Sequence, residues 1–492
     1  MKFAPAASYV GLREYNDQQI ISAPLKKGSD QLHGRCPFCI THQAMLTKII
    51  TIILFFLTAG IPLLINPLAF NSVELIKRES AYALVCLLIT CALMAAPKKN
   101  SLRLYALPIA LPLLLFALSA CLATMFSINL EFSLLGDPCR GESLFTIITY
   151  VLLSFIFAFF IQTFEQALSL IRALCIVTAI ICLYSIIEFF CLQKFGISPL
   201  QHFQPPKLRH SFISATMGNA NFLGRYLVLV LPLFAACAVK AANSKQAMLW
   251  VGGGMLGLAT LMLTYSRASM VGITVGGVVF VALTRSAGPI SRRRLGLMLG
   301  AGIGLIVFIG LLSQALSGSS PRSFFNTITS RMVSSLDLTN GDGLATRVFT
   351  WRHSLPVILE RPWLGHGPET GFNALKQVNF EKVIRFKTIA ILDRIHNNYL
   401  DIALTQGLFG LSAYLAILLI FMRGMLKKIR THGVNPGARI LLCGLFSGFA
   451  GCLVNDFFTF STVSVSMTFW ILIGIGCAIQ SFHKHEANGH GC

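Results

Sequence analysis

Charged residues are scarce in this chain of 492 residues, and acidic residues are the scarcest. Asp, Glu, Lys and Arg make up 12% of the sequence, against about a quarter in an ordinary soluble domain. Hydrophobic residues make up 55%, and the mean hydropathy is +0.70. This balance argues against a soluble globular domain and predicts a protein that lies mostly within a membrane.

Ionisable side chains are also nearly absent from the middles of the long apolar runs. These runs are about 17 to 24 residues long, enough to cross roughly 30 Å of hydrocarbon. They lack the period-two alternation of barrel strands, so we predict an all-α polytopic membrane protein with about 12 transmembrane helices. The predicted spans lie near residues 46–65, 81–96, 103–126, 144–162, 168–190, 221–240, 247–264, 268–284, 295–313, 399–421, 438–456 and 462–480.

The placement of the remaining polar residues helps to separate a transporter from an enzyme. Ion-coupled transporters place paired carboxylates or Lys near the middle of their spans. In this chain polar residues gather instead at one set of span ends: Arg140 and Glu142, Asn219 and Asn221, Arg267, Asn455 and Asp456. This pattern favours a site at a membrane face, for a molecule whose tail stays in lipid, over a pump or symporter.

The net charge of +21 is concentrated in alternate loops. Counted from a cytoplasmic N-terminus, one set of loops holds Lys98, Lys99, Lys240, Lys245, Arg285, Arg292, Arg293, Arg294, Arg423, Lys427, Lys428, Arg430 and Arg439. The positive-inside rule then places both termini in the cytoplasm and residues 318–397 outside, which is the periplasm in a Gram-negative bacterium. The basic residues are expected to contact anionic lipid headgroups. Nucleic-acid binding is not expected, because no recognition module accompanies the charge.

Five regions are predicted along the chain. They are a cytoplasmic and disordered extension (1–44), nine membrane helices (45–317), a large periplasmic loop with short helices (318–397), three more membrane helices (398–482) and a cytoplasmic tail (483–492). No signal peptide is expected before Met45, because the apolar region and cleavage site are missing. Cys36 and Cys39 have the spacing of a redox or metal motif, but no second ligand pair accompanies them.

Two arginines stand out beside predicted spans. Arg267 lies in a very short turn between two of them. It is either an interfacial side chain that snorkels to the headgroups or a guanidinium that binds a pyrophosphate through paired hydrogen bonds. Arg347 lies in a predicted amphipathic helix from Leu344 to about Leu359, ahead of a turn rich in Gly and Pro. By default, an Arg in such a loop is a solvated surface charge.

His396 closes the 318–397 loop and leads directly into a predicted span. An imidazole at a membrane face takes up a proton near neutral pH, which makes it a candidate general base. A single His beside a membrane is more often a hydrogen-bonding residue than a catalyst. Asp401 follows about 100° further round an ideal helix, so helical spacing does not pair it with His396. The motif alone leaves both interpretations open.

The order of these motifs resembles one family. The chain shows Gly218-Asn219-Ala220-Asn221-Phe222-Leu223-Gly224, Ser266-Arg267, Arg347 before Thr350-Trp351, Arg361-Pro362-Trp363-Leu364-Gly365-His366-Gly367 and His396-Asn397-Asn398-Tyr399-Leu400-Asp401. This order resembles the O-antigen ligase superfamily, which includes O-antigen polymerases of the Wzy type and protein O-oligosaccharyltransferases. Asn66-Pro67 and the segment from Leu134 to Arg140 also resemble its outer loops. The resemblance covers about residues 46–480.

The resemblance implies a metal-independent, cofactor-free glycosyltransferase of the GT-C type. Such enzymes move a glycan from undecaprenyl pyrophosphate to an acceptor hydroxyl, for example on lipid A-core, at the periplasmic face of the bacterial inner membrane. The family's essential residues match Arg267, Arg347 and His396. The two arginines are then expected to bind the pyrophosphate, and His396 is expected to activate the acceptor hydroxyl, with inversion at the anomeric carbon.

Five further residues are predicted to contact the substrates: Asn397, Tyr399, Asp401, Asn221 and Arg140. An O-antigen polymerase or a protein O-oligosaccharyltransferase would share the donor and the site, and would differ mainly in the acceptor. From another class, a polytopic transporter is the alternative, against which the clean span interiors argue.

Overall fold

The computed structural model describes residues 37–65, 73–94, 107–137, 141–196, 212–287, 344–386 and 394–482. The predicted span 295–313, Arg140, Cys36, Asn66-Pro67 and the tail 483–492 lie outside these residues. The chain divides after Met45, and everything described below belongs to the second unit, which begins at Leu46. The regular structure in the described residues is helical throughout, without a strand.

The described helices follow the apolar runs of the sequence. They are α1 (Pro37–Phe55), η1 (Phe56–Gly60), α2 (Ile61–Leu63), α3 (Val73–Met94), α4 (Ala110–Met125), α5 (Leu130–Leu135), α6 (Leu144–Phe160), α7 (Phe164–Phe195), η5 (Ala215–Met217), α8 (Ala220–Lys240), α9 (Ser244–Leu263), α10 (Arg267–Ala287), α13 (Leu344–Glu360), α14 (Gly371–Ala374), α15 (Lys376–Phe386), α16 (Asn398–Arg430), α17 (Pro436–Asn455) and α18 (Val463–Ser481).

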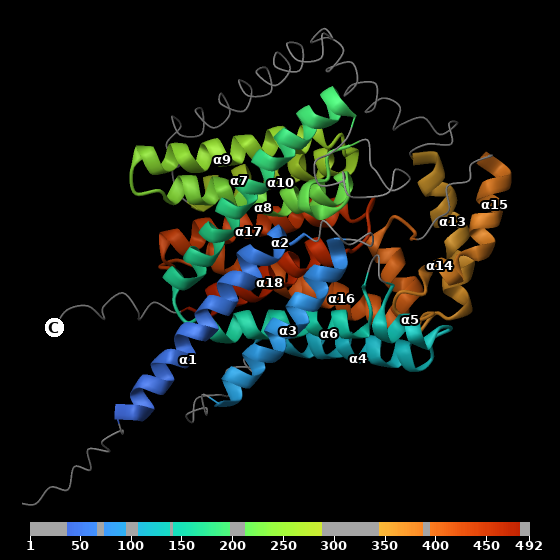
Figure 1. The fold of residues 1–492 in the computed structure, drawn as a ribbon, viewed down its shortest axis with the longest axis horizontal. Coiled ribbons are helices and arrows are strands. Elements are labelled where there is room, and N and C mark those ends of the chain that lie inside the picture. Colours follow the sequence, from blue (N-terminus) through green and yellow to red (C-terminus); the bar gives the residue numbers. More distant parts are fainter. Residues whose placement is uncertain are drawn as a thin grey trace, which may run out of the picture. The chain divides into compact units, whose positions relative to one another are not determined.

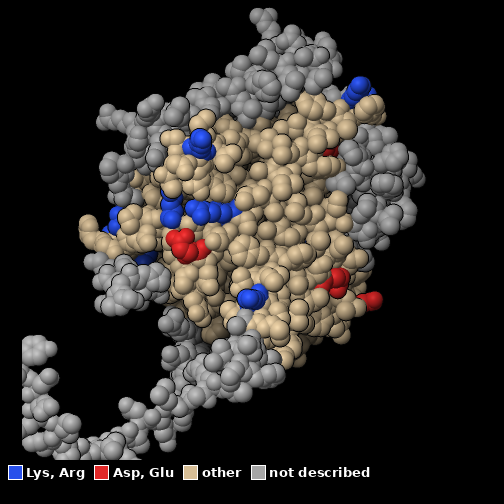
Figure 2. All heavy atoms as spheres, turned by 60° about the vertical axis from the view of Figure 1, so that its left-hand side comes forward, with Lys and Arg blue, Asp and Glu red and all other residues tan. Residues whose placement is uncertain are grey.

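Eight helices of the described chain are long and apolar enough to cross a membrane. They lie at Met45–Leu63, Phe164–Leu192, Ala220–Lys240, Ser244–Leu263, Arg267–Arg285, Asn398–Arg430, Pro436–Asn455 and Val463–Ser481. Helices α4 and α6 are apolar but shorter. Figure 2 shows a broad surface on which Lys, Arg, Asp and Glu are only scattered, as lipid contact requires. The protein is therefore a polytopic helical membrane protein, while the number of about 12 spans stays a prediction.

Helix α18 is the most deeply buried of these helices, with 94% of its apolar window inside the protein. It lies between α4 and α6 on one side and α8, α9 and α10 on the other, next to α16 and α17 (Figure 1). Glycines let α17 approach its neighbours closely: a Cβ at Gly451 would lie 2.5 Å from the carbonyl oxygen of Gly272 in α10. Helices α8, α10 and α17 thus form a closely packed group, and this group carries one edge of the site.

Helix α16 is interrupted at Gly407, which has φ 69° and ψ −174°. The predicted span 399–421 is therefore not one continuous helix. The segment 362–367 lies in the interruption and takes over its free backbone groups. The N–H of His366 donates to the Leu404 carbonyl at 2.9 Å, and the N–H of Leu408 donates to the Pro362 carbonyl at 2.7 Å. Such a break is tolerated inside a membrane protein only when other backbone satisfies it.

The contact between the segment 362–367 and α16 requires glycine at two positions. Gly365 and Gly407 both have φ of 69°, in the left-handed region where a side chain is strained. A Cβ on Gly365 would lie 2.6 Å from the backbone carbon of Thr405, and a Cβ on Gly407 would meet the carbonyl of Trp363. The Gly- and Pro-rich turn seen in the sequence is thus the segment that docks into α16.

Candidate active site

The turn before α16 carries His396. Asn397 begins the helix, and its Oδ1 accepts hydrogen bonds from the N–H groups of Tyr399 (3.0 Å) and Leu400 (3.1 Å). His396 itself has φ 57°, a conformation uncommon for a residue other than glycine. The N–H of Asn398 donates to the carbonyl of Asp456 at 2.8 Å, which ties the turn to the end of α17. The chain around His396 is therefore fixed from both sides.

The two predicted arginines lie close together. Arg267 is the first residue of α10, and Arg347 lies in the first turn of α13. Burial lowers the pKa of Arg347, and repulsion from the Arg267 guanidinium lowers it further, to about 10. The guanidinium of Arg347 also lies 5.8 Å from the ring centroid of Phe458, within the range of a cation–π contact. The guanidinium groups of Arg267 and Arg347 thus lie near each other in a partly buried environment.

An aromatic loop, defined as residues 456–462 between α17 and α18, joins the arginines to His396. The Phe458 ring contacts Arg347 and lies 6.2 Å from Trp351 of α13. Two residues further on, the Phe460 ring lies 5.2 Å from the His396 imidazole, edge to face. Sequence reasoning missed both rings. Three Phe residues within four positions at the end of a predicted span were the available signal.

The lower-ranked candidates occupy different places. The Tyr399 hydroxyl donates to the Leu453 carbonyl at 2.8 Å, which uses its only proton. Asn221 is exposed at the start of α8, and its N–H donates to the Asn219 side chain. Asp401 is buried and belongs to a polar cluster behind the turn. Asn397 serves as a helix cap, so at least part of its role is structural.

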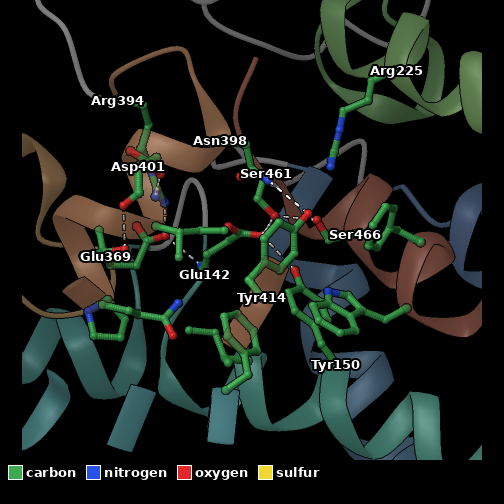
Figure 3. Close-up of a pocket in the computed structure, with 18 residues that line it drawn as sticks. Glu142, Tyr150, Arg225, Glu369, Arg394, Asn398, Asp401, Tyr414, Ser461 and Ser466 are labelled. Atoms are coloured by element: carbon green, nitrogen blue, oxygen red, sulfur yellow. Dashed lines mark hydrogen bonds and ion pairs between the residues drawn. The ribbon is translucent and has the colours of Figure 1, made fainter. Parts of the chain in front are cut away.

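That cluster centres on Arg394, which sequence reasoning gave no role. Its guanidinium forms ion pairs with Asp401, at 2.6 Å, and with Glu369. Glu142 lies nearby and accepts hydrogen bonds from the hydroxyls of Tyr150 (3.0 Å) and Ser461 (2.6 Å), as Figure 3 shows. Burial raises the pKa of Glu142, and Arg394 opposes this rise. One guanidinium therefore faces three carboxyl groups.

A cavity of about 50 Å³ lies beside this cluster. Arg225 of α8 reaches it from the other side (Figure 3), and its guanidinium pairs with Asp456 at 2.6 and 3.0 Å. The cavity has room for a few water molecules but not for a sugar ring. His396, Arg267 and Arg347 do not line it. We therefore assign it to the polar interior behind the site rather than to substrate binding.

The geometry offers two kinds of chemistry at one face of the helices. Arg267 and Arg347 bring two guanidinium groups together, and such groups can offer charge-assisted hydrogen bonds to an anion. His396 offers a titratable imidazole beside an aromatic ring. In the described part of the chain, no cluster of three or more His, Cys, Asp or Glu is placed to hold a metal.

Comparison with known proteins gives one family match and one relative. Residues 252–415 match the family described as O-antigen ligase, and this segment contains Arg267, Arg347 and His396. The chain is also similar to an uncharacterized protein of Haemophilus influenzae, with 29% identity over 112 residues. That similarity covers 23% of this chain and 28% of the relative, so the chain spans little more than a quarter of its length. The segment 252–415 is thus similar to the O-antigen ligase family, and this similarity supports membership of the O-antigen ligase superfamily.

Proposed function

We propose that this protein is a glycosyltransferase that moves a glycan from undecaprenyl pyrophosphate to a hydroxyl of lipid A-core or a similar acceptor. The observation that carries the proposal is the meeting of two mutually repelling arginines with His396 around the aromatic loop. Membership of the O-antigen ligase superfamily supports a membrane glycosyltransferase at a coarser level.

The donor binds at the two arginines. Arg267 and Arg347 are charged at neutral pH, since even the lowered pKa of Arg347 is about 10. Guanidinium groups form paired hydrogen bonds with phosphate oxygens, and two of them neutralise the charge that grows on a departing pyrophosphate. The polyprenyl tail stays in the lipid, where the scattered surface charge of the spans permits it.

Transfer is a single displacement. His396 takes the proton of the acceptor hydroxyl, the hydroxyl oxygen bonds to the anomeric carbon, and the bond from that carbon to the pyrophosphate oxygen breaks. The pyrophosphate leaves with the electron pair, and the anomeric configuration inverts. The Phe460 ring packs edge to face against the His396 imidazole and holds one side of it in place.

The site faces the periplasm of the inner membrane, and the chain termini lie in the cytoplasm. The basic residues support this orientation because they lie at the opposite helix ends from the site. Helix α8 ends at Lys240, and α16 ends with Lys427, Lys428 and Arg430. The positive-inside rule assigns such ends to the cytoplasm.

Complementation of a ligase-deficient host tests the function. We expect Arg267→Gln, Arg347→Gln and His396→Ala each to reduce lipopolysaccharide ladders about 100-fold or more at equal expression. Matched controls are Arg285→Gln at the far end of α10, Arg352→Gln on the exposed face of α13 and His432→Ala beyond α16. Full ladders with His396→Ala would refute the mechanism. Restoration of glycan chain length without attachment to the core would indicate a polymerase instead.

A further inference from the structure

Arg394 is the most strongly constrained charged residue near His396. It precedes His396 by two positions, and its side chain is 4% exposed. One guanidinium nitrogen donates to Asp401 in the first turn of α16, at 2.6 Å. Another donates to Glu369, which lies two residues after the segment 362–367 docked into the α16 interruption. Arg394 thus joins the outer loop to the start of the helix.

The charge balance keeps Arg394 in this position. Burial alone would lower the pKa of its guanidinium, but Asp401, Glu369 and Glu142 raise it, so the group is charged at every accessible pH. Its planar fork reaches carboxylates on two separate elements at once, which the single ammonium of a lysine does less well. Removing either carboxylate leaves a buried charge with an incomplete set of partners.

Two physical links run from Arg394 to His396. The first is the backbone: Ile395, between them, is fully buried, and Asn397 caps the helix immediately afterwards. The second is the Phe460 ring, whose centroid lies 5.9 Å from the Arg394 guanidinium carbon and 5.2 Å from the His396 ring. A shift of Arg394 would therefore move both the backbone and the ring that hold the imidazole.

We propose that Arg394, gripped by Glu369 and Asp401, is a positioning residue that fixes the His396 imidazole against the acceptor hydroxyl. The proposal rests on the proposed function of His396 as the general base. Arg394 does not touch the substrate. It determines where the base lies, and its loss reduces proton transfer rather than donor binding.

The test measures glycan transfer by the purified full chain in lipid nanodiscs, with a lipid-linked glycan donor and lipid A-core as acceptor. Arg394→Lys, Glu369→Gln and Asp401→Asn are compared across pH. We expect kcat to fall at least tenfold, the acidic limb of its pH profile to shift, and the KM for the donor to change less than twofold. The two carboxylate variants keep the shape of the side chain, so they serve if Arg394→Lys fails to fold.

Glu188→Gln is the matched control. Glu188 is a fully buried carboxylate that accepts the N–H groups of Ser214 and Ala215, in another part of the protein. We expect it to lower Tm while kcat and the pH profile stay as in the parent. If Glu369→Gln and Asp401→Asn behave like this control, the positioning role is wrong. If His396→Ala transfers glycan at the parental rate, the proposed function itself fails, and the role of Arg394 fails with it.

Discussion

At the scale of single residues, the repulsion between Arg267 and Arg347 is the feature with the most direct consequence. Burial lowers the pKa of Arg347 most, and the nearby Arg267 guanidinium lowers it further, so both effects weaken the protein when no anion is present. The same arrangement favours any anion that both groups can contact. Under the proposed function, the two arginines therefore favour the negative charge of the pyrophosphate before the donor binds.

We expect inorganic pyrophosphate to stabilise the protein through this pair. At ten times its Kd, the ligand adds about 1.4 kcal/mol to the free energy of unfolding. The measurement is Tm in detergent against pyrophosphate concentration. Arg267→Gln should abolish the rise in Tm, and Arg352→Gln, on the exposed side of α13, should keep it. An equal rise with Arg267→Gln would show that the anion binds elsewhere.

Glu142 should make stability depend on pH. Its pKa is raised above its usual value of 4.5, chiefly by burial, so the folded protein holds a proton that the unfolded chain has already lost. Stability therefore falls as pH rises from 4.5 through the raised pKa. Glu142→Gln removes this titration, and its Tm should fall less steeply over the same interval. Identical slopes for parent and variant would contradict the assignment.

At the scale of elements, the apolar runs predicted the helices well, because the thickness of the bilayer limits their length. The predicted span 247–264 appears as Ser244–Leu263, and 462–480 appears as Val463–Ser481. The predicted amphipathic helix from Leu344 appears as α13. Periodicity could not predict the interruption of α16, because apolar residues continue on both sides of Thr405-Gln406-Gly407 and the partner segment is far away in sequence.

The interruption of α16 predicts that adding a single methyl group at Gly407 strongly destabilises the protein. Gly407→Ala forces a side chain into the left-handed region and against the Trp363 carbonyl, so we expect it to cost about 1–3 kcal/mol or more. Gly252→Ala in α9 is the control, because its Cβ would meet no atom within 4 Å. Tm of both variants gives the comparison. A Gly407→Ala protein as stable as the parent would mean that the loop does not dock as described.

The candidate site was only partly predictable for the same reason. Arg267, Arg347 and His396 stand in recognisable motifs, but the rings between them come from a different part of the chain. Arg394 and Glu369 are separated by 25 positions, and their pairing depends on the docked segment 362–367 that precedes Glu369. Helical spacing did not pair Asp401 with His396, and the structure pairs Asp401 with Arg394 instead. Contacts between segments that are distant in sequence produce no periodic pattern from which they could be predicted.

At the scale of the whole molecule, the proposed orientation across the membrane can be measured. Lys376→Cys in α15 and His432→Cys after α16 replace exposed residues at the two ends of the bundle. In intact spheroplasts, an impermeant maleimide should label Lys376→Cys and leave His432→Cys unlabelled until the membrane is permeabilised. The parent chain, with its native cysteines, gives the background. Labelling in the opposite order would place the site in the cytoplasm.

The interruption of α16 also limits how this part of the protein could be exchanged for another sequence. The segment 362–367 completes the backbone hydrogen bonding of the helix around Gly407. This segment and the start of α16 therefore form one structural unit. A chimera that transplants the loop but stops before the helix would leave peptide groups of two unrelated sequences to fit each other inside the membrane. Successful grafts should therefore extend past Phe409.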